Sequence, residues 1–197
     1  MLSYVKEGEI MKENPQEIIF LMEQVYATLF SLANKLQVAG DKYLEKLTSR
    51  QLMTMIAIAH LPEGGATMNN IARKLGATKQ NVKQLLTNLE KKGYVVIEPC
   101  LRDKRAVNVE ITEAGKYVWL ECSEKGIIHF LDLFKDFTKE EMEIFWGFLK
   151  KMYRFDGVEQ DGFEEEAGFD MGEDQNEAQA RVLKEFEKRR NQYQNEK

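Results

Sequence analysis

Residues 67–112 contain two short helix patterns joined by a glycine-containing turn, and two short strand patterns follow. Thr67 and Thr78 stand where helix N-caps are expected, and Gly76 and Gly93 stand where such helices end. The segments 94–98 and 105–111 are β-branched or alternate apolar and polar residues, which predicts a hairpin. Helix, turn, helix and basic-tipped hairpin together predict a winged helix–turn–helix.

Helical apolar spacing also flanks this lobe on both sides. It predicts a helix from Pro15 to Gly40, a helix capped by Thr48, a long helix capped by Thr112 and a sixth capped by Thr138. The expected fold is mainly α with a small β-hairpin wing. The expected parts are an N-terminal dimerisation helix and its connection (14–47), a winged helix–turn–helix lobe (48–116), C-terminal dimerisation helices (117–155) and an acidic tail (156–197).

Charge is unevenly distributed along the chain. The formal net charge is −5, yet residues 48–116 carry 11 basic and 6 acidic side chains, whereas residues 156–197 carry 6 and 13. A phosphate backbone responds to a local basic patch and not to the overall charge. The central lobe can therefore bind nucleic acid. The tail, with ten acidic residues between 156 and 177, is expected to be a disordered tether followed by a marginal helix.

The second helix of the central pair has a face that suits a major groove. Its apolar residues would pack inward, which leaves lysine, glutamine and asparagine outside with no acidic residue before Glu90. Glutamine and asparagine can bond adenine bidentately, and lysine contacts phosphates. A face that is merely solvated usually mixes glutamate with lysine, so DNA binding is favoured. The DNA-binding residues predicted on this helix are Thr78, Lys79, Gln80, Asn81, Lys83, Gln84 and Asn88.

Three stretches carry a family resemblance: Asn70–Gly76, Leu89–Val95, and Asp103–Val107 continuing into Ile111–Gly115. They resemble the MarR family of bacterial winged helix–turn–helix transcriptional regulators, over about residues 10–155. The resemblance implies that Asp103 pairs with Arg105 to hold the wing tip. It also implies that Arg102, Lys104 or Arg105 reaches the minor groove, which attracts arginine where it is narrow.

The resemblance also implies dimerisation through the terminal helices, which are unusually apolar for a monomer. The expected function is a transcriptional regulator, with repression expected, that binds a pseudo-palindromic double-stranded operator as a homodimer. The alternative is a winged-helix protein–protein adaptor without specific DNA binding. The candidate dimerisation residues are Phe20, Tyr26, Phe30, Phe145, Trp146, Phe148 and Tyr153.

Other functional classes lack sequence support. We find no phosphate-binding loop, dinucleotide fingerprint or nucleophile–base set, and His60 and His129 lack metal-ligand spacing, so no enzyme, cofactor or metal is expected. Cys100 and Cys122 are expected to be idle thiols. No stretch is long enough to span a membrane, and a cytoplasmic location is expected. The resemblance implies a small aromatic effector, for which Tyr26, Phe30, Tyr43, Phe130 and Phe134 could line a cleft; plain core packing is the alternative.

Overall fold

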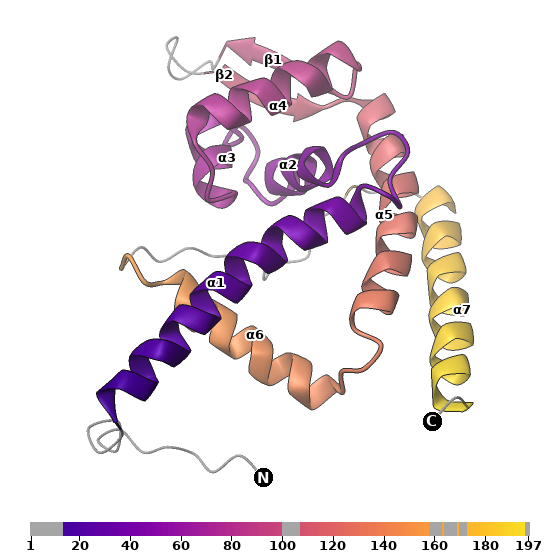
Figure 1. Cartoon of the computed structure of the whole chain (residues 1–197). Helices are drawn as coiled ribbons and strands as arrows, with labels where there is room; N and C mark the ends of the chain where they lie inside the picture. The colour runs from indigo at the N-terminus through magenta and orange to yellow at the C-terminus, as the bar shows by residue number, and fades with distance from the viewer. Residues whose placement is uncertain (1–13, 100–106, 158–162, 164–168, 170–172, 196–197) are drawn as a thin grey trace. The chain divides into compact units, whose positions relative to one another are not determined.

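Seven helices and one β-hairpin make up the residues that the structure, a computed structural model, describes: 14–99, 107–157, 163, 169 and 173–195 (Figure 1). They fall into two compact units, Met1–Ala39 and Gly40–Lys197. The predicted fold class, mainly α with a small hairpin wing, is confirmed.

Helix α1 (Pro15–Gly40) forms the described part of the first unit. Asn14 precedes it, and its side-chain oxygen accepts a hydrogen bond from the Gln16 backbone amide at 3.1 Å. A lone helix has no core of its own, and the large apolar side chains along α1 are exposed. They include Ile19, Phe20, Leu21, Met22, Tyr26 and Phe30.

The second unit contains the predicted winged-helix lobe. Helices α2, α3 and α4 pack on one another and on the hairpin, because each places its apolar residues on one face. The largest fully buried side chains, including Met55, Ile71, Leu86 and Val109, form one core. The bounds are α2 (Ser49–Ala59), α3 (Met68–Lys74), α4 (Lys79–Lys91), β1 (Val95–Pro99) and β2 (Val107–Ile111).

The two strands pair antiparallel with Val95 opposite Ile111 and Pro99 opposite Val107. The chain before α3 joins this sheet, since the Val109 amide donates to the Ala66 carbonyl at 3.0 Å. Pro99 is the last residue of β1 and pairs with Val107. The sequence predicted a strand that ends one residue earlier, at Glu98. The hairpin is thereby fixed against the entrance to α3.

The start of α5 (Glu113–Leu133) explains why Thr112 and Gly115 stand three positions apart in the sequence. The Thr112 hydroxyl donates to the Gly93 carbonyl at 2.7 Å and accepts from the Gly115 amide at 3.0 Å. A Cβ atom built on Gly115 would overlap the carbonyl oxygen of Tyr94. Glycine is therefore required for α5 to begin this close to β1.

Helix α6 (Lys139–Tyr153) begins with the predicted capping box. The Glu141 amide donates to the Thr138 hydroxyl at 3.2 Å, and the Thr138 amide donates to the Glu141 carboxylate at 2.9 Å. None of the side chains of α6 is buried, although the helix carries seven large hydrophobic residues that are exposed. In the described part of the chain, α6 therefore presents an apolar face that is largely exposed.

The C-terminal part differs from the sequence expectation of a tether and a marginal helix. Helix α7 (Glu173–Asn195) begins inside the acidic run and lies beside α5 (Figure 1). Its Ala178 is 2% exposed, and two arginines pair with carboxylates of α5. The sequence predicted a marginal helix here, but not its packing on α5, because ion-paired residues form much of the packed face.

No helix in the described ranges combines the length and the apolar character needed to cross a bilayer.

Candidate nucleic-acid interface

Helix α4 is oriented as the sequence predicted. Val82, Leu86 and Leu89 are fully buried, so the opposite face points outward. The Thr78 hydroxyl caps the helix by accepting the Asn81 amide at 3.2 Å. The side chains predicted to contact DNA are all exposed on this face and at its N-terminus: Thr78, Lys79, Gln80, Asn81, Lys83, Gln84 and Asn88.

The turn between the two helices is fixed by backbone bonds. The Ala77 amide donates to the Ala72 carbonyl at 2.9 Å, and Gly76 has a φ of +59°, a left-handed conformation that favours glycine. On the other side of α3, the Asn70 side-chain amide donates to the Gly65 carbonyl at 2.8 Å. Both ends of α3 are therefore held, which fixes the direction in which α4 leaves the turn.

Lys92 is a positioning residue that sequence reasoning missed. Its ammonium donates to the Lys46 carbonyl at 2.7 Å and to the Gln51 side-chain oxygen at 3.1 Å. The same Gln51 oxygen accepts the Thr48 amide in the capping box of α2. Lys92 thus ties the end of α4 to the start of α2. No local pattern could reveal this, because the bonded groups lie 41 and 46 positions away.

Basic side chains of α3 differ in where they point. Lys74 is 7% exposed, and its ammonium lies 5.4 Å from the centre of the Phe163 ring. Arg73, in the same last turn, is exposed. Arg73 is therefore a further cation available to a polyanion, whereas Lys74 is held inside the fold.

The predicted wing-tip residues Arg102, Asp103, Lys104 and Arg105 lie outside the described residues, as does Cys100. The hairpin is described up to the pair Pro99 and Val107. The wing contacts therefore stay predictions.

Cys122 is 1% exposed within α5, and burial raises the pKa of its thiol. A thiol with a raised pKa forms little thiolate at neutral pH and reacts slowly with oxidants.

Among the described residues, no three His, Cys, Asp or Glu side chains gather as metal ligands.

Aromatic residues considered for an effector cleft have other neighbours in the second unit. The Tyr43 ring lies 4.9 Å from His129 and its hydroxyl donates to Asp132 at 3.0 Å. Phe134 packs edge-on to Phe137, and Phe130 is 55% exposed. The structure does not gather these three rings around one contact, and Tyr26 and Phe30 belong to the other unit.

Every candidate dimerisation residue is exposed in the single chain. Four of them are on α6 and three on α1, with exposures of 36% or more. The residues are Phe20, Tyr26, Phe30, Phe145, Trp146, Phe148 and Tyr153.

The sequence comparisons agree with this geometry. Residues 46–106 match the model of the MarR family. The transcriptional activatory protein BadR of Rhodopseudomonas palustris is 29% identical over 102 residues, which are 50% of this chain and 58% of BadR. The HTH-type regulator YfiV of Bacillus subtilis is 38% identical over 63 residues, 32% of this chain and 39% of YfiV. The chain thus spans only about half the length of these relatives.

Solved structures extend the likeness beyond the lobe. The MepR–DNA complex of S. aureus superposes with a TM-score of 0.58 at 27% identity, covering 65% of this chain and 96% of MepR. The family matched by residues 46–106 consists of DNA-binding transcriptional regulators.

Proposed function

We propose that this chain, whose winged helix–turn–helix lobe matches the model of the MarR family, regulates transcription by binding double-stranded DNA at a specific sequence. The observation that carries the proposal is the exposed face of α4. It presents two lysines and four amide side chains, and its first acidic residue is Glu90 near the far end.

We propose a separate role for each kind of side chain on this surface. Lys79 and Lys83 contact phosphates and set the position of α4 in the major groove. Gln80, Asn81 and Gln84, at the N-terminal half of the helix, face base edges and supply sequence preference. Arg102, Lys104 or Arg105 at the wing reaches the neighbouring minor groove, with Asp103 holding Arg105. MepR, which was solved as a DNA complex, supports this use of the lobe.

We propose a homodimer as the active form. The exposed apolar residues of α1 and α6 need a partner, and a second copy of the chain supplies the same two helices. A symmetric dimer reads two half-sites whose centres are about one helical turn, roughly 34–36 Å, apart. The operator is then pseudo-palindromic.

Repression, a small aromatic effector and a cytoplasmic location complete the proposal. Repression follows if the operator overlaps a promoter. BadR, by its name, is an activator, so a promoter–reporter fusion is used to measure whether this chain represses or activates.

An effector would act by favouring one spacing of the two lobes. A thermal-shift screen of phenolic acids tests it, with a rise in Tm as the supporting result.

The identity of the operator is tested by selection from random duplex DNA. The purified full chain should enrich one pseudo-palindromic sequence. Gln80→Ala and Asn81→Ala should each lose about 1–3 kcal/mol of discrimination at particular base pairs if they read bases. Enrichment of no sequence over repeated rounds would contradict the proposal and favour the protein–protein adaptor.

A further inference from the structure

The second half of α5 has little support from the core. The buried residues of α5 are Gly115, Val118 and Cys122, and beyond Cys122 every residue is at most half-buried. Gly126 lies in the middle of this helix, and glycine weakens a helix interior. A helical segment of this length is marginal without tertiary contacts. The distal half of α5 therefore needs a partner.

Helix α7 is that partner, and it lies parallel to α5 in a constant register. The Arg181 guanidinium pairs with Glu124 at 2.6 Å, and the Arg189 guanidinium pairs with Asp132 at 2.6 Å. Both pairs join residues 57 positions apart, so the two helices advance together. The packed residues of α7, Ala178, Val182, Glu185 and Arg189, recur at spacings of four, three and four, so they lie on one face of the helix.

The two ion pairs lie on either side of Gly126. Glu124 precedes the glycine by two residues and Asp132 follows it by six. Arg181 makes a forked contact with Glu124, with its second nitrogen at 3.4 Å, a geometry that fixes orientation as well as distance. Helix α7 thus bridges the weakest point of α5.

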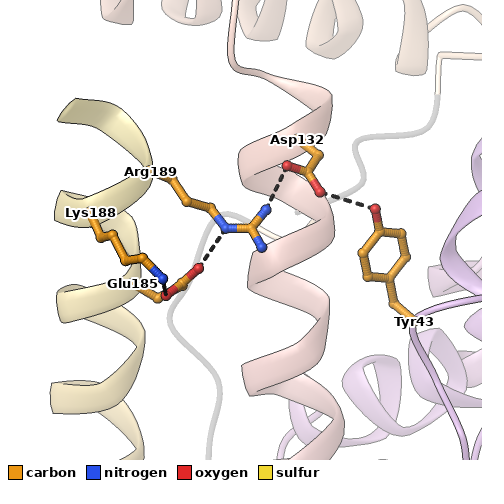
Figure 2. A network of polar contacts seen from close by, with 5 residues as sticks. All are labelled: Tyr43, Asp132, Glu185, Lys188 and Arg189. Atoms are coloured by element: carbon orange, nitrogen blue, oxygen red, sulfur yellow. Dashed lines mark hydrogen bonds and ion pairs between the residues drawn. The ribbon is translucent and has the colours of Figure 1, made fainter. Parts of the chain in front are cut away.

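The distal pair is also linked to the segment before α2. One oxygen of Asp132 accepts Arg189 at 2.6 Å, and the other accepts the Tyr43 hydroxyl at 3.0 Å (Figure 2). Glu185, one turn earlier on α7, accepts the Arg189 Nε at 2.7 Å and so orients the guanidinium (Figure 2). At the other end, Phe169 packs edge-on to Trp119 of α5, with ring centres 4.8 Å apart, just before α7 begins.

We propose that α7 is a splint for α5. It spans Gly126, keeps residues 127–133 helical, and stiffens the connection from the winged-helix lobe to α6. In the dimer that connection sets how far apart the two lobes are held. This last consequence rests on the proposed function, whereas the stiffening of α5 does not.

The stiffening is tested by hydrogen exchange of the full chain. Arg181→Ala/Arg189→Ala should raise the exchange rate of amides 127–133 by about tenfold, because opening of this segment no longer has to break the two ion pairs with α7. The matched control is Lys151→Ala/Lys184→Ala. It removes the same charge from exposed side chains of α6 and α7. The control should change these rates by less than about twofold.

A rescue variant separates a splint from a general loss of stability. A Cβ atom at Gly126 would meet nothing within 4 Å, so Gly126→Ala fits. Added to the arginine variant, it should slow exchange of residues 127–133 by about fivefold, the helix preference of alanine over glycine. Unchanged rates in the arginine variant, no slowing by Gly126→Ala, or an equal acceleration in α2 and α4 would each overturn the proposal.

The dimer consequence is read from operator spacing. Inserting one base pair between half-sites should weaken binding of the arginine variant less than binding of the control, by about threefold, since a looser connection tolerates the change. Equal penalties would overturn this part. If neither protein binds any operator while exchange behaves as predicted, the proposed function fails and the splint stands.

Discussion

Among the glycines that the structure describes, Gly115 is the one whose added Cβ atom would come closest to another atom. Gly115→Ala should lower the free energy of unfolding by about 1–3 kcal/mol, because the new methyl group meets the Tyr94 carbonyl and not a flexible side chain. Urea unfolding measures it. Gly126→Ala in the same helix is the control and should be neutral or slightly stabilising, since its Cβ faces open space. Equal effects at the two glycines would contradict this packing.

Cys122 gives a second prediction at the residue scale. Its raised pKa and 1% exposure predict that iodoacetamide does not modify it in the folded protein at pH 7.5. Because the pKa of the Cys122 thiol is raised, the reaction should become faster only at a pH above the ordinary pKa of a cysteine. Peptide mass spectrometry follows Cys122 separately from Cys100, and the urea-unfolded chain is the positive control. Rapid labelling of Cys122 in the native protein would show that α5 is open there.

At the scale of elements, an ion pair joins the α1–α2 connection to α5. Lys46 donates to Glu121 and lowers the pKa of that carboxyl. A lowered folded-state pKa adds stability above the ordinary value of 4.5, and that stability is lost as pH falls through the lowered value.

Glu121→Gln should therefore cost about 0.2–1 kcal/mol at pH 7, the range for exposed pairs, and nothing at pH 2. Urea unfolding across this pH range measures the difference. Glu23→Gln removes an exposed carboxylate of α1 and is the control for the change of charge. If Glu121→Gln lowered the free energy of unfolding equally at pH 2, the loss would come from altered packing and not from the ion pair.

Elements with local signals could be predicted from sequence, whereas the packing of α7 on α5 through distant charges could not. Four predicted helix starts have the expected N-cap: Thr48, Thr78, Thr112 and Thr138. They could be predicted because an N-cap bonds a backbone amide only three residues further along the chain. Helix α7 packs through Arg181 and Arg189, and nothing near them in sequence reveals that Glu124 and Asp132 lie opposite. The same holds for Lys92, whose acceptors belong to another element.

At the scale of the whole molecule, the exposed apolar residues of α1 predict a stable dimer. Phe30 is 68% exposed, and Phe30→Glu should shift the protein towards monomer in sedimentation velocity at micromolar concentration, because the charge would be buried in the interface. Lys35→Gln, an exposed position on the same helix, changes the net charge by the same amount and should remain dimeric. A wild-type monomer at these concentrations would contradict the dimer.

Helix α4 is proposed to bind DNA through lysine contacts with phosphates. The most direct test is the salt dependence of binding to the selected operator, followed by fluorescence anisotropy. If a dimer makes about six phosphate contacts, the log–log slope should be near −5. Lys79→Ala removes one contact per protomer and should make that slope about 1.8 units less steep. A flat salt response in the wild-type protein, or an unchanged slope in Lys79→Ala, would contradict this account.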